Sequence, residues 1–254
     1  MASILMLKLM HLNKLTKLYI MKKEHLSYSA LTQFKKSPNH LLAYWEGKQK
    51  TTDAMLFGSL IHKIILQPET FDFEYVVFEG KARRGKEWVE FAEINKNKTI
   101  IKQSELDAAL EITNAVANDK IFMDLISKCT KREQRVEWVE QGVNFKGFVD
   151  MVGDGWIADI KTCTDALKLK RDIYYNDYKM QGAMYLENFP PNTKYYIIAV
   201  EKNIPYNVKV FRLAENMLEA GYLDYIDLTA KYNEWDGNPQ GYAEEIEELS
   251  FKED

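Results

Sequence analysis

Residues 147–161 read GFVDMVGDGWIADIK, and this stretch indicates more about the fold than any other part of the chain. Asp154-Gly155 is a strong hairpin signal, and it separates two apolar runs at residues 144–152 and 156–161. Both runs are short, rich in β-branched and aromatic residues, and bounded by turn residues, as is typical of strands. The sequence therefore predicts two antiparallel strands joined by a tight turn.

Three charged side chains fall inside these strands. Asp159 and Lys161 are two residues apart, so their side chains share one face of a strand whose other residues are apolar. Asp150 precedes the turn, and antiparallel pairing brings its carboxylate close to that of Asp159. Charges in a buried strand are costly unless another group binds them. The pattern indicates a functional site, and the alternative is a partly buried salt bridge between Lys161 and one of the aspartates.

A divalent cation would relieve the repulsion between the two carboxylates. Oxygen ligands in an incomplete protein cage suit magnesium, with manganese as the alternative. Such an ion polarises a phosphodiester and lowers the pKa of a bound water. Lys161 would orient that water and offset the negative charge that grows on phosphorus. These residue types point to metal-dependent hydrolysis of a phosphodiester.

Three side chains outside the two strands are further candidates for the site. His62 lies among apolar residues of a predicted helix, where it is either a hydrogen-bonded core residue or a metal ligand. Gln181 and Tyr185 are spaced i, i+4 on another predicted helix, so they project from one face. They contact DNA phosphate or brace the lysine, or else form a polar rim on a packed helix. The residues alone leave these alternatives open.

Candidates for contact with DNA lie in a basic stretch between residues 80 and 86, whose alternative interpretation is a solvated loop. They are Lys81, Arg83, Arg84 and Lys86, and Ser29 near the chain's first predicted helix is a further candidate. The net charge of −4 is uneven: residues 215–254 hold twelve acidic residues against two lysines, a net of −10, which leaves +6 elsewhere. A basic body with an acidic tail fits a polyanion-binding protein, although scattered surface charge gives the same balance.

Helices are predicted before the two strands, and helices and strands after them. The expected helices are at residues 27–36, 38–45, 55–66, 104–119, 119–127, 167–188 and 214–235, and further strands are at 71–78, 135–139, 195–200 and 207–213. This order predicts an α/β fold with a central mixed β-sheet flanked by helices, and an α+β fold is the alternative.

The composition is that of a globular protein, with 46 % hydrophobic and 28 % charged residues, and no repeat or linker divides the chain. We expect residues 23–254 to form a single domain with an acidic C-terminal helix and tail. Residues 1–22 are expected to be an N-terminal extension, disordered or not native to the protein. Residues 2–20 include three lysines and a histidine, so they predict neither a transmembrane helix nor a signal peptide. Two cysteines cannot form a four-cysteine cluster, and they fit a reducing cytoplasm.

Four motifs, taken in order, resemble the exonuclease VIII family, which comprises phage and prophage recombination nucleases of the PD-(D/E)XK superfamily. They are SYSALTQFKKSPNHLLAYW, GSLIHKIILQPE, GFVD followed by WIADIKT, and QGAMY, within roughly residues 26–200. The resemblance implies a restriction-endonuclease-like core. It implies metal ligands at His62, Asp150, Asp159 and the backbone carbonyl of Ile160. Lys161 would then be the catalytic lysine, and Gln181 and Tyr185 the family's Q-x-x-x-Y motif.

The resemblance further implies an activity and partners. The expected activity is processive 5′→3′ digestion of linear double-stranded DNA from its ends, with magnesium or manganese and without an iron–sulfur cluster. The expected partners are a single-strand annealing recombinase and further copies of the chain, in a ring of three or four subunits. The expected location is the cytoplasm of a bacterial host, with the gene carried by a phage or prophage.

Three other functions remain open on the sequence. An endonuclease of the same superfamily would use the same site, but the chain lacks a second, sequence-reading domain. A catalytically inactive DNA-binding or assembly protein would keep the scaffold, but loss of activity usually removes the charged site residues first. A structural protein with a chance cluster of ion pairs would bind no divalent ion.

Overall fold

A computed structural model describes residues 23–49, 51–80 and 82–242 of the protein. The chain divides into two compact units, unit 1 (Met1–Gln49, Val139–Phe145 and Ile226–Asp254) and unit 2 (Lys50–Trp138 and Lys146–Tyr225). The predicted extension at residues 1–22 and the end of the acidic tail, from residue 243, lie outside the described residues. The expectation of one nuclease domain over residues 23–254 stays a prediction.

Unit 2 is built on a mixed five-stranded sheet with the order β3-β4-β5-β6-β7. The strands are β3 (Cys129–Glu140), β4 (Val143–Gly153), β5 (Trp156–Cys163), β6 (Lys194–Glu201) and β7 (Val208–Arg212). The tips of β3 and β4 belong to unit 1. The pairs β4–β5 and β6–β7 are antiparallel, while β5 and β6 are parallel. The predicted hairpin and the mixed sheet are both confirmed.

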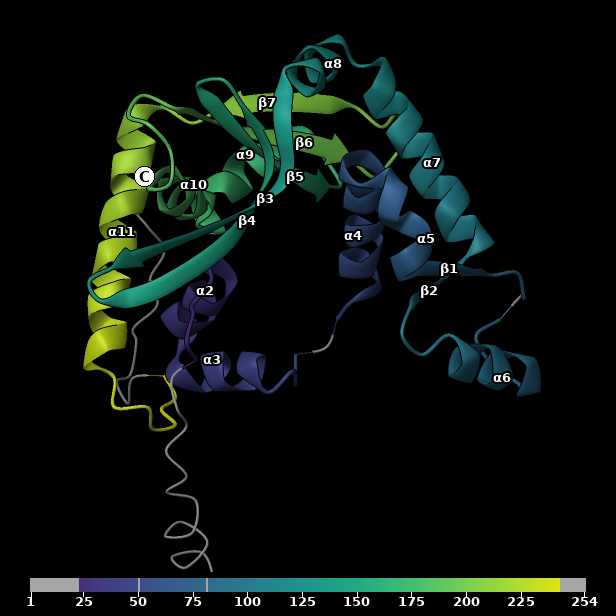
Figure 1. Ribbon diagram of the computed structural model, residues 1–254, viewed down its shortest axis with the longest axis horizontal. Coiled ribbons are helices and arrows are strands. Elements are labelled where there is room, and N and C mark those ends of the chain that lie inside the picture. Colours follow the sequence, from purple (N-terminus) through teal and green to yellow (C-terminus); the bar gives the residue numbers. More distant parts are fainter. Residues whose placement is uncertain (1–22, 50, 81, 243–254) are drawn as a thin grey trace, which may run out of the picture. The chain divides into compact units, whose positions relative to one another are not determined.

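Helices cover both faces of this sheet, as Figure 1 shows. The helices of unit 2 are α4 (Asp53–Leu66), α5 (Phe71–Glu74), α6 (Lys86–Ile94), α7 (Gln103–Asn118), α8 (Lys120–Ser127), α9 (Ala166–Tyr175), α10 (Tyr178–Leu186) and the first half of α11 (Glu215–Glu234). Apolar residues of α4 and α7 pack against Ala158, Ile160 and Ile198 on one face. On the other face, Gly182 of α10 lies against the ring of Tyr195. The α/β prediction, a mixed sheet flanked by helices, is therefore confirmed.

Two predicted elements differ from the structure. The strand expected at residues 71–78 begins as a helical turn, α5, after a short 3₁₀ helix at Pro68–Thr70, and only Tyr75–Phe78 forms strand β1. Stacking of Phe71 on Tyr75, with ring centroids 5.2 Å apart, accompanies this helical turn. The single helix expected at residues 167–188 is two helices, because Asp177 adopts a left-handed φ of 57° between α9 and α10.

One strand of a small second sheet, and one helix, have no counterpart in the sequence prediction. Strand β2 (Thr99–Lys102) pairs in parallel with β1, and α6 lies between these two strands in the chain. Strand β2 has four residues, which is too short for a clear periodic signal. Their pairing joins segments more than twenty residues apart, so it depends on tertiary contacts.

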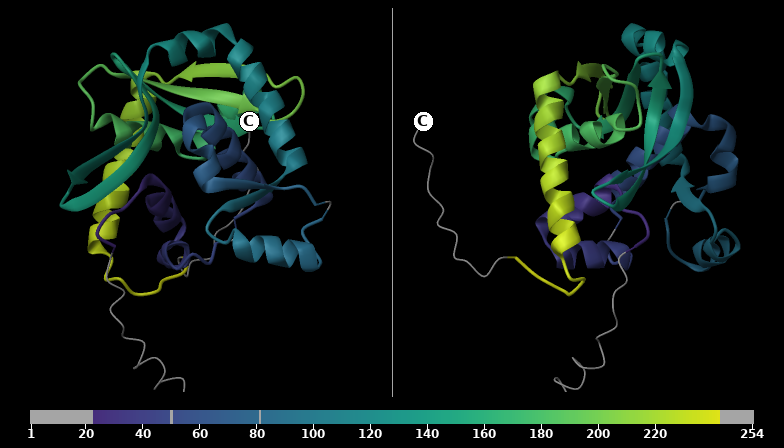
Figure 2. Two further views of the ribbon diagram at one scale, coloured as in Figure 1. Left: turned by 45° about the vertical axis from the view of Figure 1, so that its right-hand side comes forward. Right: turned by 60° about the vertical axis from the view of Figure 1, so that its left-hand side comes forward.

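Helix α11 runs along unit 2 in its first half, and Figure 2 shows it as one long helix. A Cβ at Gly221 would lie 2.3 Å from the carbonyl oxygen of Lys179, so the two helices approach closely only because this residue is glycine. The indole N–H of Trp138 donates a hydrogen bond of 2.8 Å to the Tyr225 hydroxyl. These contacts tie α11 to α10 and to β3.

Unit 1 contains α2 (Tyr28–Lys36) and α3 (Pro38–Trp45), with the strand tips and the last part of α11. Ser27 and Ser37 cap the two helices through their side chains, and Pro38 occupies the first position of α3. Phe34 packs edge-on against Tyr232 with ring centroids 5.5 Å apart. None of the helices in the described ranges combines the length and apolar character needed to span a membrane.

Candidate active site

The candidate site lies in unit 2, where β4 and β5 diverge. Their ladder pairs Gly153 with Trp156, Val152 with Ile157 and Met151 with Ala158. Beyond these pairs, the side chain of Asp150 takes the place of a backbone carbonyl as hydrogen-bond acceptor. Its Oδ2 accepts a hydrogen bond of 2.6 Å from the Ile160 N–H. The same register places Asp150 opposite Asp159. The predicted approach of these two carboxylates therefore follows from the hairpin.

Asp159 and Lys161 form an ion pair on β5. The side chain of Asp159 is 4 % exposed and that of Lys161 is 20 % exposed, so the lysine is the more accessible partner of the pair. The Lys161 ammonium also lies 4.9 Å from the centre of the Tyr178 ring, a cation–π contact. Burial alone would lower the pKa of Lys161, but Asp159 and Asp150 outweigh it and raise that pKa, so the lysine stays charged.

His62 reaches the sheet from α4. A Cβ at Gly58, one turn earlier, would lie 2.9 Å from Thr162 Oγ1, so glycine lets α4 come close to β5. The Nδ1 atom of His62 is 3.5 Å from Asp150 Oδ2. Burial lowers the pKa of His62 and outweighs the opposing effects of Asp159 and of a hydrogen bond to the Ile160 backbone. The imidazole is therefore neutral near pH 7, which is the form that binds metals.

Gln181 and Tyr185 approach from α10, on the side of Asp159. The Gln181 amide donates to Asp159 Oδ1 at 3.3 Å and to the Tyr185 hydroxyl at 3.2 Å. A Cβ at Gly147 would lie 2.5 Å from the Tyr185 ring, so glycine on β4 makes room for that ring. Burial, with Asp159, raises the pKa of Tyr185 to about 12, so its hydroxyl stays protonated. In this structure both residues brace the aspartate, whereas the sequence left bracing of the lysine, DNA contact and a polar rim as alternatives.

Glu133 is a site residue that the sequence did not reveal. Its carboxylate, His62 and Asp150 each offer one ligand atom, and these atoms lie within 4.8 Å of one another. Glu133 adopts a left-handed φ of 47° within β3, a conformation that costs a side-chain-bearing residue roughly 1–2 kcal/mol. A signal was present in the sequence. Gln141-Gly142 between two strand-like segments predicts a two-residue hairpin turn, and counting residues back from that turn would set Glu133 opposite Asp150.

The donors in this cluster fit a divalent cation. Burial, then the nearby Asp159, raises the pKa of Asp150 well above the ordinary value of a carboxyl group. Burial and Asp159 also raise the pKa of Glu133. Buried carboxylates that repel one another are stabilised by a cation, and carboxylate oxygens with one imidazole suit magnesium or manganese. The predicted Ile160 carbonyl ligand stays a prediction, although the backbone of Ile160 contacts both Asp150 and His62.

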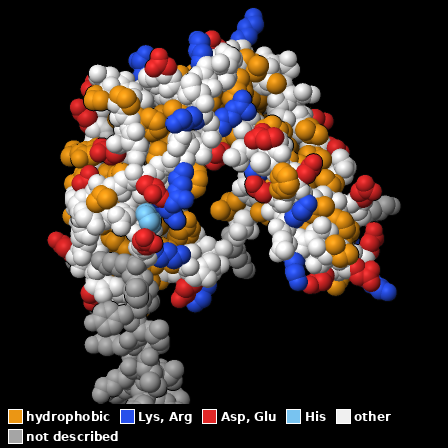
Figure 3. All heavy atoms as spheres, viewed as in Figure 1, with side chains coloured by type: hydrophobic (Ala, Val, Ile, Leu, Met, Phe, Trp, Pro, Cys, Tyr) orange, Lys and Arg blue, Asp and Glu red, His pale blue; other side chains and the backbone are white. Residues whose placement is uncertain are grey.

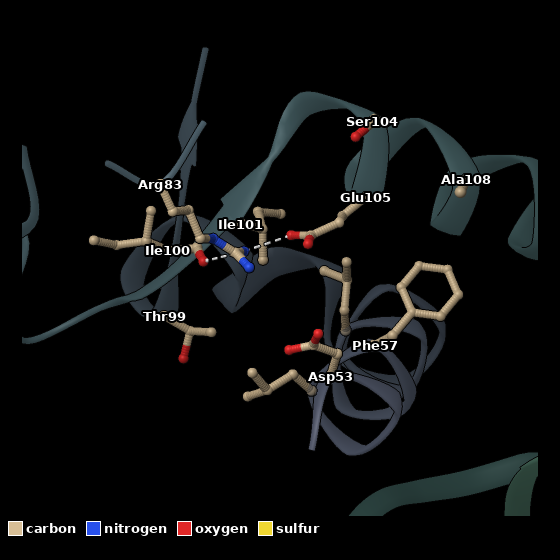
Figure 4. A pocket seen from close by; sticks show the side chains of 11 residues that line it. Asp53, Phe57, Arg83, Thr99, Ile100, Ile101, Ser104, Glu105 and Ala108 are labelled. Atoms are coloured by element: carbon tan, nitrogen blue, oxygen red, sulfur yellow. Dashed lines mark hydrogen bonds and ion pairs between the residues drawn. The ribbon is translucent and has the colours of Figure 1, made fainter. Parts of the chain in front are cut away.

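The structure does not join the predicted DNA-contact residues to this cluster. Lys81 lies outside the described residues, and Ser29 is exposed on the first turn of α2 in unit 1. Arg83 is engaged within the protein: it donates to the Ile100 carbonyl at 3.0 Å and to Glu105 at 2.7 Å, on the wall of a cavity of about 270 Å³ (Figure 4). Arg84 and Lys86 are exposed to a greater degree. Figure 3 shows basic side chains interspersed with acidic ones on the face in view.

Comparisons with known proteins agree with this architecture. Residues 27–247 match the model of a family described as a PDDEXK-like domain of unknown function (DUF3799). A crystal structure from Eubacterium rectale, provisionally described as an exonuclease, is similar with a TM-score of 0.62 at 16 % identity, over 93 % of this chain and 95 % of that one. At this identity the likeness shows a shared fold.

Two further comparisons add no functional information. The crystal structure of SSO0001 gives a TM-score of 0.38 at 15 % identity, over 90 % of this chain and 87 % of that one, which is too low to support an argument. No functionally curated protein matches the sequence.

Proposed function

The chain belongs to the PDDEXK-like domain family, and on that premise we propose that it is a metal-dependent deoxyribonuclease. The observation that carries the proposal is the convergence of His62, Asp150, Asp159 and Lys161 at the divergence of β4 and β5. Chance ion pairs on a sheet would not also recruit a neutral imidazole from α4 and a glutamine from α10.

Each residue has a proposed role. His62, Asp150 and Asp159 would hold the cation, which when bound polarises the phosphodiester and favours ionisation of water. Lys161 keeps its positive charge beside the carboxylates, where it can orient water and stabilise the charge that develops on the phosphate. Gln181 fixes one oxygen of Asp159, and Tyr185 in turn fixes Gln181. The two α10 residues therefore act by positioning Asp159.

The finer proposal is a processive 5′→3′ exonuclease that acts on the ends of linear double-stranded DNA in phage-type recombination. The four sequence motifs resembling the exonuclease VIII family support it, and so does the provisional description of the Eubacterium rectale protein as an exonuclease. On the same resemblance we propose a homo-oligomeric ring, a trimer or tetramer, that works with a single-strand annealing protein in the cytoplasm of a bacterial host.

Digestion of matched DNA substrates tests the proposal. Linear double-stranded DNA with 5′-phosphate ends and closed circular DNA are each incubated with magnesium, with manganese or with a chelator. We expect loss of the linear DNA alone, and only with metal. Labels on the 5′ and 3′ ends then report polarity, because a 5′→3′ enzyme releases the 5′ label first.

Other outcomes would change the assignment. Cutting of the circle would show an endonuclease. A folded protein that cuts neither DNA with either metal would be a DNA-binding or assembly protein on this scaffold, and the nuclease proposal would be wrong.

A further inference from the structure

Among the three residues of the ligand cluster, Glu133 is the one that comes from a strand carrying none of the four motifs. It lies on β3, seventeen residues before Asp150, and its carboxylate shares a cluster of ligand atoms with Asp150 and His62. The three ligand atoms lie within 4.8 Å of one another, so one cation of ordinary size can contact all three.

The local backbone is arranged to place this side chain. Glu133 has a φ of 47° inside a strand, although its neighbours are extended and glycine would adopt this angle more easily. A glutamate in a conformation that costs free energy indicates that its carboxylate has a functional role.

The charge of Glu133 has no cationic partner among the residues that the structure describes. No hydrogen bond or ion pair to its carboxylate is formed there, and the residue is half-buried. The nearby cation is Lys63, which is itself engaged by Glu74 and by Gln67, the latter at 2.8 Å. The remaining acidic neighbours, Asp159 and Glu74, repel Glu133.

We propose that Glu133 is a direct ligand of the divalent cation and that it binds the ion from β3, together with His62, Asp150 and Asp159. The inference rests on the proposed function for the presence of a catalytic ion. Asp159 on β5 already contacts Lys161 and Gln181. Glu133 would therefore supply the ligand that reaches the ion from β3. Three carboxylates and an imidazole favour manganese over magnesium more than an all-oxygen site does.

Titration of manganese into the metal-free full-length protein tests this assignment. Affinity is measured by calorimetry, and free manganese by electron paramagnetic resonance. The test variant is Glu133→Gln, which keeps the size and the backbone conformation. The matched control is Glu137→Gln on the same strand, whose carboxylate pairs with Arg135 instead. We expect Glu133→Gln to weaken manganese binding at least about tenfold and Glu137→Gln to leave it unchanged.

Two further measurements separate a ligand from a structural role. The metal-free Glu133→Gln protein should melt no lower than wild type, because the change removes an unpartnered buried charge, but manganese should raise its melting temperature less. Its DNA cleavage should recover as manganese is increased, since a missing ligand lowers affinity.

The outcomes distinguish this inference from the proposed function. Wild-type manganese affinity in Glu133→Gln would overturn the inference even if the protein cuts DNA. If the wild type binds manganese but cuts no DNA, and Glu133→Gln binds manganese more weakly, the inference is supported and the nuclease proposal is wrong. Absence of manganese binding by the wild type would refute both.

Discussion

At the residue scale, Lys161 and Asp159 depend on each other. The ion pair keeps the lysine charged and satisfies an aspartate that is otherwise closed off from water. Removing one partner leaves the other as a buried, uncompensated charge, which is costly, whereas neutralising both is much less so. Activity and stability therefore respond differently to single and double changes at this pair.

We predict that Lys161→Ala lowers cleavage by roughly 10²–10³-fold or more, because it removes the charge beside the developing phosphate charge. It should also lower stability, because Asp159 would be left as a buried charge without its cationic partner. The double variant Lys161→Met, Asp159→Asn should regain stability in thermal melts without regaining cleavage. Cleavage by either the single or the double variant at wild-type rate would remove Lys161 from the catalytic set.

Three of the charged site residues could be predicted from local sequence, because they lie on adjacent strands of one hairpin. Period-two alternation put Asp159 and Lys161 on one face, and the Asp154-Gly155 turn put Asp150 opposite them. Glu133 could not be predicted in this way, because the strand predicted from the sequence begins only at Arg135. In addition, the left-handed backbone of Glu133 breaks the alternation of side chains along β3. Its place in the cluster depends on the full length of that strand.

At the element scale, glycines set how closely the helices approach the sheet around the site. Gly58 lets α4 approach β5, and Gly147 leaves room on β4 for the Tyr185 ring of α10. The sequence shows that glycines precede His62 and Asp150, but it does not show what lies against them. That information comes from helices packed across the sheet, far away in the chain.

We predict that Gly147→Ala destabilises the protein by about 1–3 kcal/mol, since the new methyl group would collide with the Tyr185 ring and displace it from Gln181. Cleavage should fall with it because Asp159 loses its brace. Chemical denaturation and kinetics measure the two effects. Lys146→Ala, an exposed neighbour on β4, is the control, and equal stability of the two variants would contradict the packing argument.

The loop between β1 and α6 and the start of α6 carry the more exposed basic residues. Arg83 is used internally against Glu105, so we propose Arg84 and Lys86 as the residues that contact DNA phosphate. We predict that replacing both with alanine weakens DNA binding and lowers the slope of log affinity against log salt by about one per lost contact. The affinity of catalytically inactive protein over a salt series measures this slope. An unchanged slope would assign these residues to a solvated loop.

At the scale of the whole molecule, the site makes the metal-free protein sensitive to pH. The folded state raises the pKa of Asp150, so folded protein holds this proton more tightly than the unfolded chain does. Stability from this group is therefore present at low pH and is lost as the pH rises through the raised pKa. A tenfold difference in proton affinity between the folded and unfolded chains corresponds to about 1.4 kcal/mol. A bound cation would cancel this loss.

We predict that Asp150→Asn melts at least about 2 °C above the wild type when both are metal-free near pH 8, and that this advantage shrinks as the pH falls. Asparagine keeps an oxygen that can accept the Ile160 N–H, so the backbone contact survives. Added manganese should stabilise the wild type more than the variant, because the variant lacks one carboxylate ligand. A variant that melts lower at every pH would show that the carboxylate is not destabilising.

The amino-acid sequence was sufficient for the α/β class, the central hairpin, and the side-by-side placement of Asp159 and Lys161. These follow from periodicity and turn chemistry, which act over a few residues. Three features could be seen only in the tertiary structure. They are the β1–β2 pairing, the break between α9 and α10, and the meeting of His62, Glu133 and Gln181 at Asp150 and Asp159. They depend on packing between segments distant in sequence, where glycine contacts, buried charge and a left-handed residue outweigh local preference.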